Sequence, residues 1–193
     1  MKRLGTLFII SGTSQAGKST VARALVRERA LKLTNIRTNT TRPRRAEDKQ
    51  SRQYHFHSVP EFKRLIAQGE LLEWARVHGF YYGTPRRAVE RALARGRNVT
   101  LVIDYQGARQ VKRLKPEAIT IFISAGSPVQ VKRLIMASTH VPASQKLARW
   151  RSAQKEFKAM REYDYRIMNR RGQLDETLAR VRRIIIQHSR RQP

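Results

Sequence analysis

A glycine-rich segment that holds one lysine and one serine carries the strongest chemical signal in this sequence. Gly12-Thr-Ser-Gln-Ala-Gly17-Lys18-Ser19 fits the Walker A spacing, in which backbone N–H groups and a helix N-terminus surround phosphate oxygens. The lysine of this pattern reaches the terminal phosphates, and the hydroxyl residue ligates Mg²⁺. The segment therefore predicts a site for a nucleoside triphosphate with Mg²⁺. The residues expected to line it are Gly12, Thr13, Ser14, Gln15, Ala16, Gly17, Lys18, Ser19 and Thr20.

Arginines, tyrosines and one carboxylate further along the chain suggest a second site, for an acceptor. Two arginines and two tyrosines near one another can hold a monophosphate dianion through charge-assisted and hydroxyl hydrogen bonds. A carboxylate can accept hydrogen bonds from both N1–H and N2–H of guanine, a pair of donors that adenine lacks. Taken singly, the aromatic residues are typical of core packing and the arginines of solvated surface, but their joint spacing favours a receptor for GMP. The segments concerned are Thr38-Asn-Thr-Thr-Arg42-Pro-Arg-Arg45, Tyr54-His-Phe56, Glu73-Trp74-Ala and His78-Gly-Phe-Tyr-Tyr82-Gly-Thr84-Pro85.

Apolar runs predict the frame that must position these residues. Leu4–Ser11, Val99–Asp104 and Ile119–Ser124 are apolar without alternation, as expected of strands buried on both faces of a parallel sheet. A helix is predicted from Lys18 to about Ala30, a last strand over Tyr165–Asn169 and a closing amphipathic helix over Leu174–His188. The predicted fold class is α/β, with ligands at the carboxyl ends of the strands.

Polar segments separate these core elements. Residues 36–58, rich in Thr, Asn, Arg and Pro, interrupt the pattern and predict an inserted subdomain. Residues 136–144 are polar and irregular, which predicts a mobile lid, and a long basic helix follows to about Glu162. Capping signals predict three more helices, which start at Ser58-Val-Pro-Glu61, Thr84-Pro85 and Ser127-Pro128 and extend to Gly69, to near Gly96 and through Leu134.

Together with Ile103-Asp104-Tyr-Gln106-Gly107, these segments resemble the guanylate kinases, P-loop nucleoside monophosphate kinases, over nearly the whole chain. The resemblance implies a P-loop three-layer fold, a parallel sheet flanked by helices, with an inserted GMP-binding subdomain and a short lid. The implied activity is transfer of a phosphoryl group from ATP to GMP or dGMP. The implied ranges are a core of about 1–35, 96–135 and 163–193, a GMP-binding subdomain of about 36–95 and a lid of about 136–149.

The resemblance also implies a role for individual residues. Asn169 would lie near the ATP adenine, and Ser19 and Asp104 would hold Mg²⁺. Thr38 and Thr84 stand where the family commonly has serine, so the hydroxyl is kept. The implied catalytic residues are Lys18, Arg42, Asp104 and Arg149. The implied GMP-binding residues are Thr38, Arg42, Arg45, Tyr54, Glu73, Tyr82, Thr84 and Asp104.

Four departures from the family pattern bear on catalysis. Val102 replaces an acid two positions before Asp104, and Ser138 replaces a lid arginine that closes over the transferring phosphate. Loss of such a transition-state cation lowers turnover, unless Lys132, Arg133, Lys146 or Arg151 takes its place. Cations at Arg170 and Arg171 follow Asn169 where the family has acids, which affects donor preference. In the acceptor loop Glu47-Asp48 and Ser51 replace a Gly-Glu pair and a later glycine.

The chain of 193 residues has 41 Lys and Arg against 14 Asp and Glu, a formal net charge of +27. Phosphorylated substrates use only some of these cations. The excess predicts either nonspecific contact with nucleic acid or another polyanion, or a basic protein without such a partner. No apolar run approaches the roughly 20 residues that cross a bilayer. With no cysteine, a cytoplasmic location is expected, and the sequence gives no oligomeric state.

Two rival functions follow from the same residues. The first is a kinase for another phosphorylated small molecule, such as ribose 1,5-bisphosphate, against which Glu73 argues. The second is a weakly catalytic guanylate-kinase-like module that binds a polyanionic partner, against which Lys18 and Ser19 argue. His55 and His57, two apart on a predicted strand, form a weak candidate for a metal pair because no third ligand is evident.

Overall fold

A five-stranded parallel sheet forms the centre of the computed structural model, which describes residues 4–45, 48, 53–139, 141–170 and 172–189. The strand order is β2-β7-β1-β8-β9, and each of the four neighbouring pairs is parallel. The strands are β1 (Leu7–Gly12), β2 (Leu33–Asn35), β7 (Asn98–Val102), β8 (Ile119–Ser124) and β9 (Tyr165–Met168).

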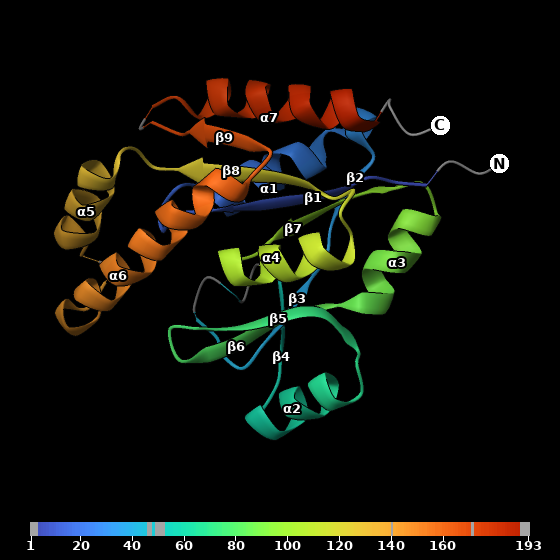
Figure 1. Ribbon diagram of the computed structural model, residues 1–193, viewed down its shortest axis with the longest axis horizontal. Coiled ribbons are helices and arrows are strands. Elements are labelled where there is room, and N and C mark those ends of the chain that lie inside the picture. The colour runs from blue at the N-terminus through green and yellow to red at the C-terminus, as the bar shows by residue number, and fades with distance from the viewer. Residues whose placement is uncertain (1–3, 46–47, 49–52, 140, 171, 190–193) are drawn as a thin grey trace.

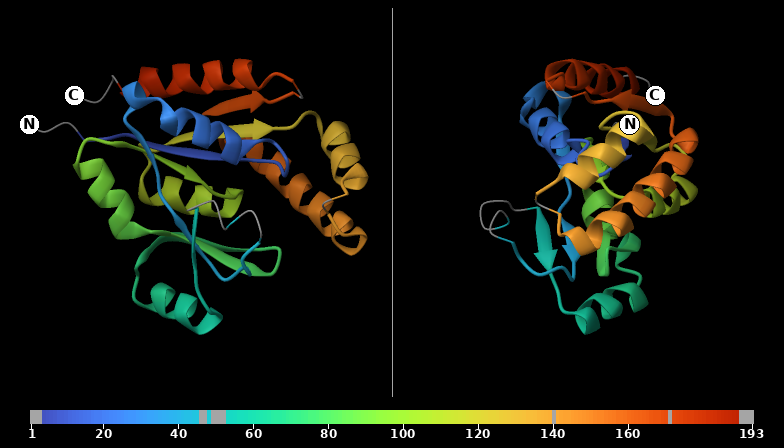
Figure 2. Two further views of the ribbon diagram at one scale, coloured as in Figure 1. Left: turned by 180° about the vertical axis from the view of Figure 1, so that it is seen from behind. Right: turned by 90° about the vertical axis from the view of Figure 1, so that its left-hand side faces the viewer.

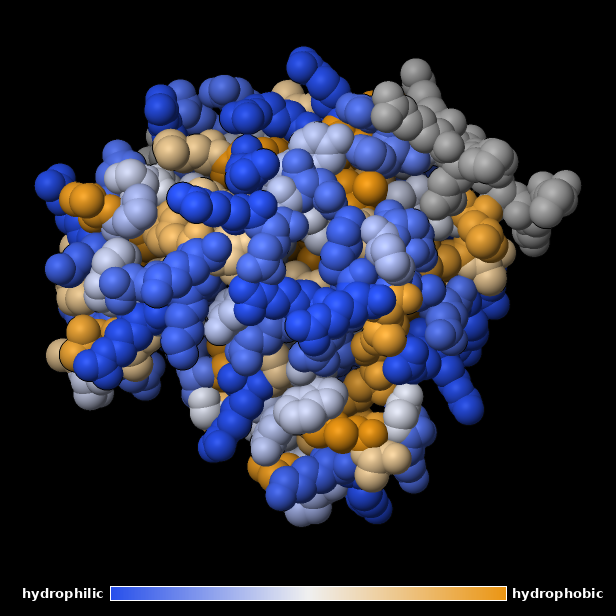
Figure 3. Space-filling view, viewed as in Figure 1, coloured by the Kyte–Doolittle hydropathy of each residue, from blue (hydrophilic) through white to orange (hydrophobic). Residues whose placement is uncertain are grey.

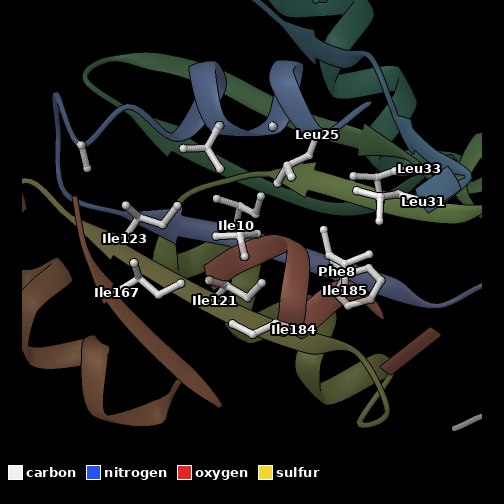
Figure 4. Packing of buried hydrophobic residues seen from close by; sticks show 14 residues of the cluster. Phe8, Ile10, Leu25, Leu31, Leu33, Ile121, Ile123, Ile167, Ile184 and Ile185 are labelled. Atoms are coloured by element: carbon white, nitrogen blue, oxygen red, sulfur yellow. The ribbon is translucent and has the colours of Figure 1, made fainter. Parts of the chain in front are cut away.

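Helices cover both faces of this sheet. On one face, helices α1 (Lys18–Arg27) and α7 (Leu174–Ser189) pack on Phe8 and Ile10 of β1 (Figure 4). On the other, α3 (Arg86–Ala94) and α4 (Tyr105–Leu114) pack on Leu7 and Ile9 (Figure 1). Because successive side chains of a strand point to opposite faces, a strand between two helical layers must be apolar at every position. The predicted three-layer α/β fold is confirmed.

A second, four-stranded sheet lies beyond α4 and carries helix α2 (Val59–Ala67) (Figures 1 and 2). Its order is β4-β3-β6-β5, with β3 and β4 parallel and β6 antiparallel to both β3 and β5. The strands are β3 (Thr38–Thr40), β4 (Tyr54–Phe56), β5 (Leu71–Val77) and β6 (Phe80–Pro85). This sheet falls inside the predicted insert of residues 36–95.

Two helices project as an arm at the carboxyl edge of the large sheet (Figure 2). They are α5 (Pro128–Ala137) and α6 (Ala143–Ala159), and the short 3-10 helix η3 (Met160–Glu162) follows α6. Val131 and Ile135 of α5 pack on Ala153 of α6. The irregular lid segment is therefore shorter than predicted, because α5 continues to Ala137 and Pro142 at the N-cap fixes the start of α6.

Several predicted boundaries shift. β1 begins at Leu7 instead of Leu4, and α1 ends at Arg27 with a 3-10 helix, η1 (Arg29–Leu31), after it. β7 ends at Val102, so Asp104 lies outside the strand and caps α4. The predicted capping signals are confirmed at Ser58 and Ser127, where both capping boxes form. None of the described helices is long and apolar enough to cross a membrane.

Candidate active site

The phosphate loop connects β1 to α1 and is fastened to β8. Gly12 has φ of 136°, and a Cβ atom there would overlap the carbonyl of Ile123, so only glycine fits. The backbone N–H of Thr13 donates to the Ile123 carbonyl at 3.1 Å, and its Oγ1 accepts from the Ala125 N–H at 3.2 Å. The loop therefore lies at the carboxyl edge of the sheet, where ligands of such folds bind.

Lys18 begins α1 and turns back over this loop. Its Nζ donates to the carbonyls of Gly12 and Thr13, both at 2.7 Å. Burial of the ammonium lowers the pKa of Lys18, and the carboxylates of Glu156 and Asp104 oppose this shift. The lysine therefore supplies a positive charge inside a ring of backbone dipoles, as binding of phosphate requires.

Asn169, which follows β9, links the phosphate loop to α7. Its Nδ2 donates to the Ala16 carbonyl at 3.0 Å, and its Oδ1 accepts from Thr177 Oγ1 at 3.0 Å. Gly17 has φ of 75°, which favours glycine, and a Cβ atom there would lie only 2.8 Å from the same Nδ2. That Asn169 lies near the ATP adenine stays a prediction. Arg170 is exposed, and Arg171 lies outside the described residues.

Asp104 and Ser19 offer oxygen ligands of the kind that Mg²⁺ prefers. Asp104 caps α4, and its Oδ1 accepts from the Gly107 N–H while its Oδ2 accepts from Gln106 Nε2, each at 2.9 Å. Ser19 lies in the first turn of α1. Two such oxygens can complete an octahedral shell with phosphate oxygens and water. The residues therefore fit Mg²⁺. His57, one half of the candidate metal pair His55 and His57, forms a hydrogen bond with Asn39 Oδ1 at 2.8 Å.

Glu73 and Thr84 form a buried pair on the second sheet, next to α4. They stand opposite each other on β5 and β6, and Thr84 Oγ1 donates to Glu73 Oε1 at 2.5 Å. Burial raises the pKa of Glu73 to about 7, the Thr84 hydrogen bond opposes this rise, and nearby Asp104 adds to it. Oε2 of Glu73 faces Gly107 of α4 so closely that a Cβ atom there would overlap it.

Arg42, Tyr54 and Tyr82 gather on the second sheet. The guanidinium of Arg42 lies 5.2 Å from the centre of the Tyr54 ring, and Tyr54 meets Tyr82 edge-on at 6.2 Å. Arg42 also forms a two-pronged ion pair with Asp48, at 2.9 and 3.0 Å. Thr38 pairs with Tyr54 across the neighbouring strands β3 and β4. Four of the predicted phosphate and base contacts are thus brought together.

Asp48 was not predicted to hold the acceptor loop. Its Oδ2 accepts from the Arg45 N–H at 2.7 Å, and Arg42 holds the pKa of the Asp48 carboxyl below its usual value. The Asp48 carboxylate therefore shapes the acceptor loop, whose conformation the resemblance did not predict. Glu47 and Ser51 lie outside the described residues.

A cavity of about 650 Å³ separates the phosphate loop, the acceptor loop and the arm. Arg149 of α6 faces it, and burial together with the charge of Arg45 lowers the pKa of Arg149. The Nε of Arg149 is enclosed without a hydrogen-bond partner among the described residues. The lining residues are Gln15, Arg45, Ser138, Val141, Pro142, Gln145 and Arg149.

A family model described as "Guanylate kinase" matches residues 4–188. The chain belongs to this family. It is 40% identical to the guanylate kinases of Shewanella oneidensis and Dechloromonas aromatica, over 96% and 94% of this chain and 88% of each relative. The crystal structure of guanylate kinase from Anaplasma phagocytophilum matches with a TM-score of 0.79 and 29% identity, over 99% of this chain and 89% of that one.

In the lid of this guanylate kinase family member, Ser138 stands at the position of the lid arginine, and it is the C-cap of α5. Among the cations that could replace it, Lys146 is engaged elsewhere, because its Nζ donates to the Met136 carbonyl at 2.6 Å. Lys132, Arg133 and Arg151 are exposed on the arm and do not line the cavity. The structure brings Arg149 and Arg45 to this cavity, which Gln15 of the phosphate loop also lines.

Glu156 is a further site residue that the sequence reasoning missed. It lies on α6 two turns after Arg149, and its Oε2 is enclosed without a partner among the described residues. Burial raises its pKa to about 7, opposed by the charge of Lys18 and favoured by that of Asp104. The Ser14 N–H also lowers this pKa. A lone acid in a basic helix carries no local signal, so only the folded arrangement reveals it.

Proposed function

We propose that this protein transfers the γ-phosphoryl group of MgATP to GMP or dGMP. The observation that carries the proposal is the buried Glu73–Thr84 pair, 3% and 1% exposed, beside the Asp104 end of α4. A carboxylate at such a site has a large free-energy cost unless a ligand supplies donors, and guanine supplies two through N1–H and N2–H. Family membership supports the same reaction.

The reaction needs no general base. A phosphate oxygen of GMP attacks the γ-phosphorus, the bond from this phosphorus to the β–γ bridging oxygen breaks, and its electron pair stays on the β-phosphate of ADP. The second pKa of a phosphate monoester is about 6, so the acceptor is already an anionic nucleophile at neutral pH. The products are GDP and ADP.

Charge compensation and positioning are the tasks of the protein. Lys18 and the loop amides hold the β- and γ-phosphates, Arg42, Arg45, Tyr54 and Tyr82 hold the GMP phosphate, and Arg149 approaches the transferring group from the arm. Ser19 and Asp104 would hold Mg²⁺, which supplies further compensation of phosphate charge. Thr38, Glu73 and Thr84 read the base, and Asn169 lies at the adenine side.

The domain assignment belongs to this proposal. In it, residues of about 36–95 form the GMP-binding part, about 136–149 the lid, and about 1–35, 96–135 and 163–193 the core. Closure of the first two over the phosphate loop would exclude water and so suppress hydrolysis of ATP. Cytoplasmic location stays a prediction from the cysteine-free sequence, and nonspecific contact with a polyanion stays a proposal based on the net charge of +27.

The test is ADP formation from MgATP with GMP, dGMP, AMP, UMP or ribose 1,5-bisphosphate, for the wild type, Glu73→Gln and Glu70→Gln. Glu70 is an exposed acid three residues away and serves as the matched control. We expect turnover with the guanine nucleotides alone and a loss of about 10²-fold or more in kcat/KM for GMP in Glu73→Gln only. Turnover of ribose 1,5-bisphosphate that Glu73→Gln leaves intact would favour the first rival. GMP binding without turnover would favour the binding module.

A further inference from the structure

We propose that the side-chain amide of Gln15 is a further catalytic residue, which donates a hydrogen bond to the phosphoryl group in transfer. The amide would partly replace the lid arginine that other members of the family have at the position of Ser138. The inference rests on the proposed function and concerns a residue that the Walker A pattern leaves open, since its four middle positions accept any residue.

The backbone at Gln15 is the first observation. Its φ is +62°, in the left-handed region, whereas the other two left-handed positions of the loop are the glycines Gly12 and Gly17. A residue with a Cβ atom adopts this conformation at a cost in free energy, and glycine adopts it freely. Strain of this kind persists where the surrounding structure enforces it, and it clusters at active sites. The backbone conformation at this position thus favours glycine, yet the residue there has a side chain.

The position of the side chain is the second observation. Gln15 is exposed and lines the cavity between the phosphate loop, the acceptor loop and the arm. Arg45 faces it from the acceptor side, and Ser138 and Arg149 face it from the arm. No carboxylate of the described residues lines this cavity, so two cations and neutral amides surround a space suited to an anion. Burial first, and then the charge of Arg45, lowers the pKa of Arg149, and an anion in the cavity would offset both effects.

The chemistry of the step fits a neutral donor. As the bond between the GMP oxygen and the γ-phosphorus forms and the bond to the bridging oxygen breaks, negative charge spreads over the oxygens of the transferring group. An amide N–H directed at one of these oxygens stabilises the transition state without gaining or losing a proton. Gln15 therefore acts on kcat more than on the binding of either nucleotide.

Gln15→Gly separates this role from a structural one, because it relieves strain while it removes the amide. We expect a higher Tm, a fall in kcat of about 10- to 100-fold, and KM values for ATP and GMP within about twofold of the wild type. The matched control is Lys32→Gly. Lys32 has φ of +46° and precedes β2 at the amino edge of the sheet, so this variant should raise Tm and leave kcat unchanged.

Ser138→Arg supplies a second readout. In that background the arginine should replace the amide, so Gln15→Gly should cost less than about threefold in kcat. Gln15→Gly with unchanged kcat, or with a change confined to the KM for ATP, would overturn the proposal. If the wild type itself forms no ADP with GMP, the proposed function fails first. If it turns over and Gln15→Gly equals it, only the role of Gln15 fails.

Discussion

The charge of Glu73 changes in the pH range of ordinary assays, because burial raises the pKa of its carboxyl to about 7. The ionised form is the one that accepts from both guanine donors. Protons and GMP therefore compete for the same oxygens in the free enzyme. The Thr84 hydroxyl, which donates to Oε1, keeps this carboxylate oriented while leaving lone pairs on both oxygens.

We predict a pH dependence of GMP binding with a definite sign. Above pH 7 the carboxylate is ionised and the KM for GMP is constant; below pH 7 the KM rises by up to about tenfold per pH unit. Steady-state rates at saturating ATP between pH 5.5 and 8.5 measure it. Glu73→Gln shares the titration of the GMP phosphate but lacks the carboxyl, so its profile gives the baseline. A wild-type profile that matches this baseline would rule out Glu73 as the base-reading group.

At the scale of elements, helix α4 fixes the strand that carries Glu73. Gly107 in its first turn leaves room for the Glu73 carboxylate. One turn later, Gln110 accepts from the Trp74 N–H at 3.2 Å and donates to the Trp74 carbonyl at 2.7 Å. The helix that Asp104 caps therefore also sets the position of the strand that carries Glu73, which ties the proposed metal side of the site to the proposed acceptor side.

Gly107→Ala should uncouple these two sides. The added methyl group would overlap Glu73 Oε2, and since the carboxylate is buried, it must turn away from the base. We expect the KM for GMP to rise by about tenfold or more, with the KM for ATP unchanged. Arg113→Ala, an exposed position on the same helix, is the control. Equal KM values in both variants would show that the pocket accommodates the methyl group.

Helix α7 supports the phosphate loop through Thr177, which is 1% exposed and donates to Asn169. Thr177→Val keeps the shape but removes the donor, so the Asn169 amide keeps only its bond to the phosphate loop. We expect the free energy of unfolding to fall by about 1 kcal/mol. Urea unfolding measures it, with exposed Thr139→Val as a control expected to stay within about 0.5 kcal/mol. No difference between the two would mean that water replaces the hydroxyl.

The elements that could be predicted from the sequence are those with apolar runs or capping signals, such as β8, whose predicted bounds are those of the structure. Strands β2 and β3 have three residues each, too few for any periodicity, and α4 follows a strand directly and has a glycine in its first turn. The site shows the same division. Motif spacing and resemblance indicated the candidate nucleotide-binding residues, whereas Asp48 and Glu156 act through contacts made only on folding.

At the scale of the whole molecule, the 14 Asp and Glu are far outnumbered by the 41 Lys and Arg, and several of these acids are engaged in ion pairs. Four acids pair with cations in the described structure, namely Glu28, Asp48, Glu162 and Asp164. Between Pro128 and Ala159 the single acid is Glu156, whose Oε2 is enclosed. The visible surface is accordingly hydrophilic over most of its area (Figure 3). The arm presents five exposed cations, namely Lys132, Arg133, Arg151, Lys155 and Lys158.

This distribution predicts salt-dependent binding of duplex DNA without sequence preference. Each cation that neutralises a phosphate releases a counterion, so log K should fall linearly with log salt concentration. Replacing Arg133, Lys155 and Lys158 by glutamine should reduce that slope by about 1 for each phosphate that is no longer neutralised. Fluorescence anisotropy with two unrelated duplexes measures both affinity and slope.

The matched control replaces Arg87, Arg91 and Arg95, three exposed cations of α3 and the turn after it, by glutamine. A decrease in slope confined to the arm variant would place the DNA on α5 and α6, the helices that flank the proposed lid. DNA should then inhibit turnover at low salt, since a bound arm cannot close. Equal decreases in both variants would indicate a field spread over the whole surface, and no binding at low salt would mean that the charge serves only the phosphorylated substrates.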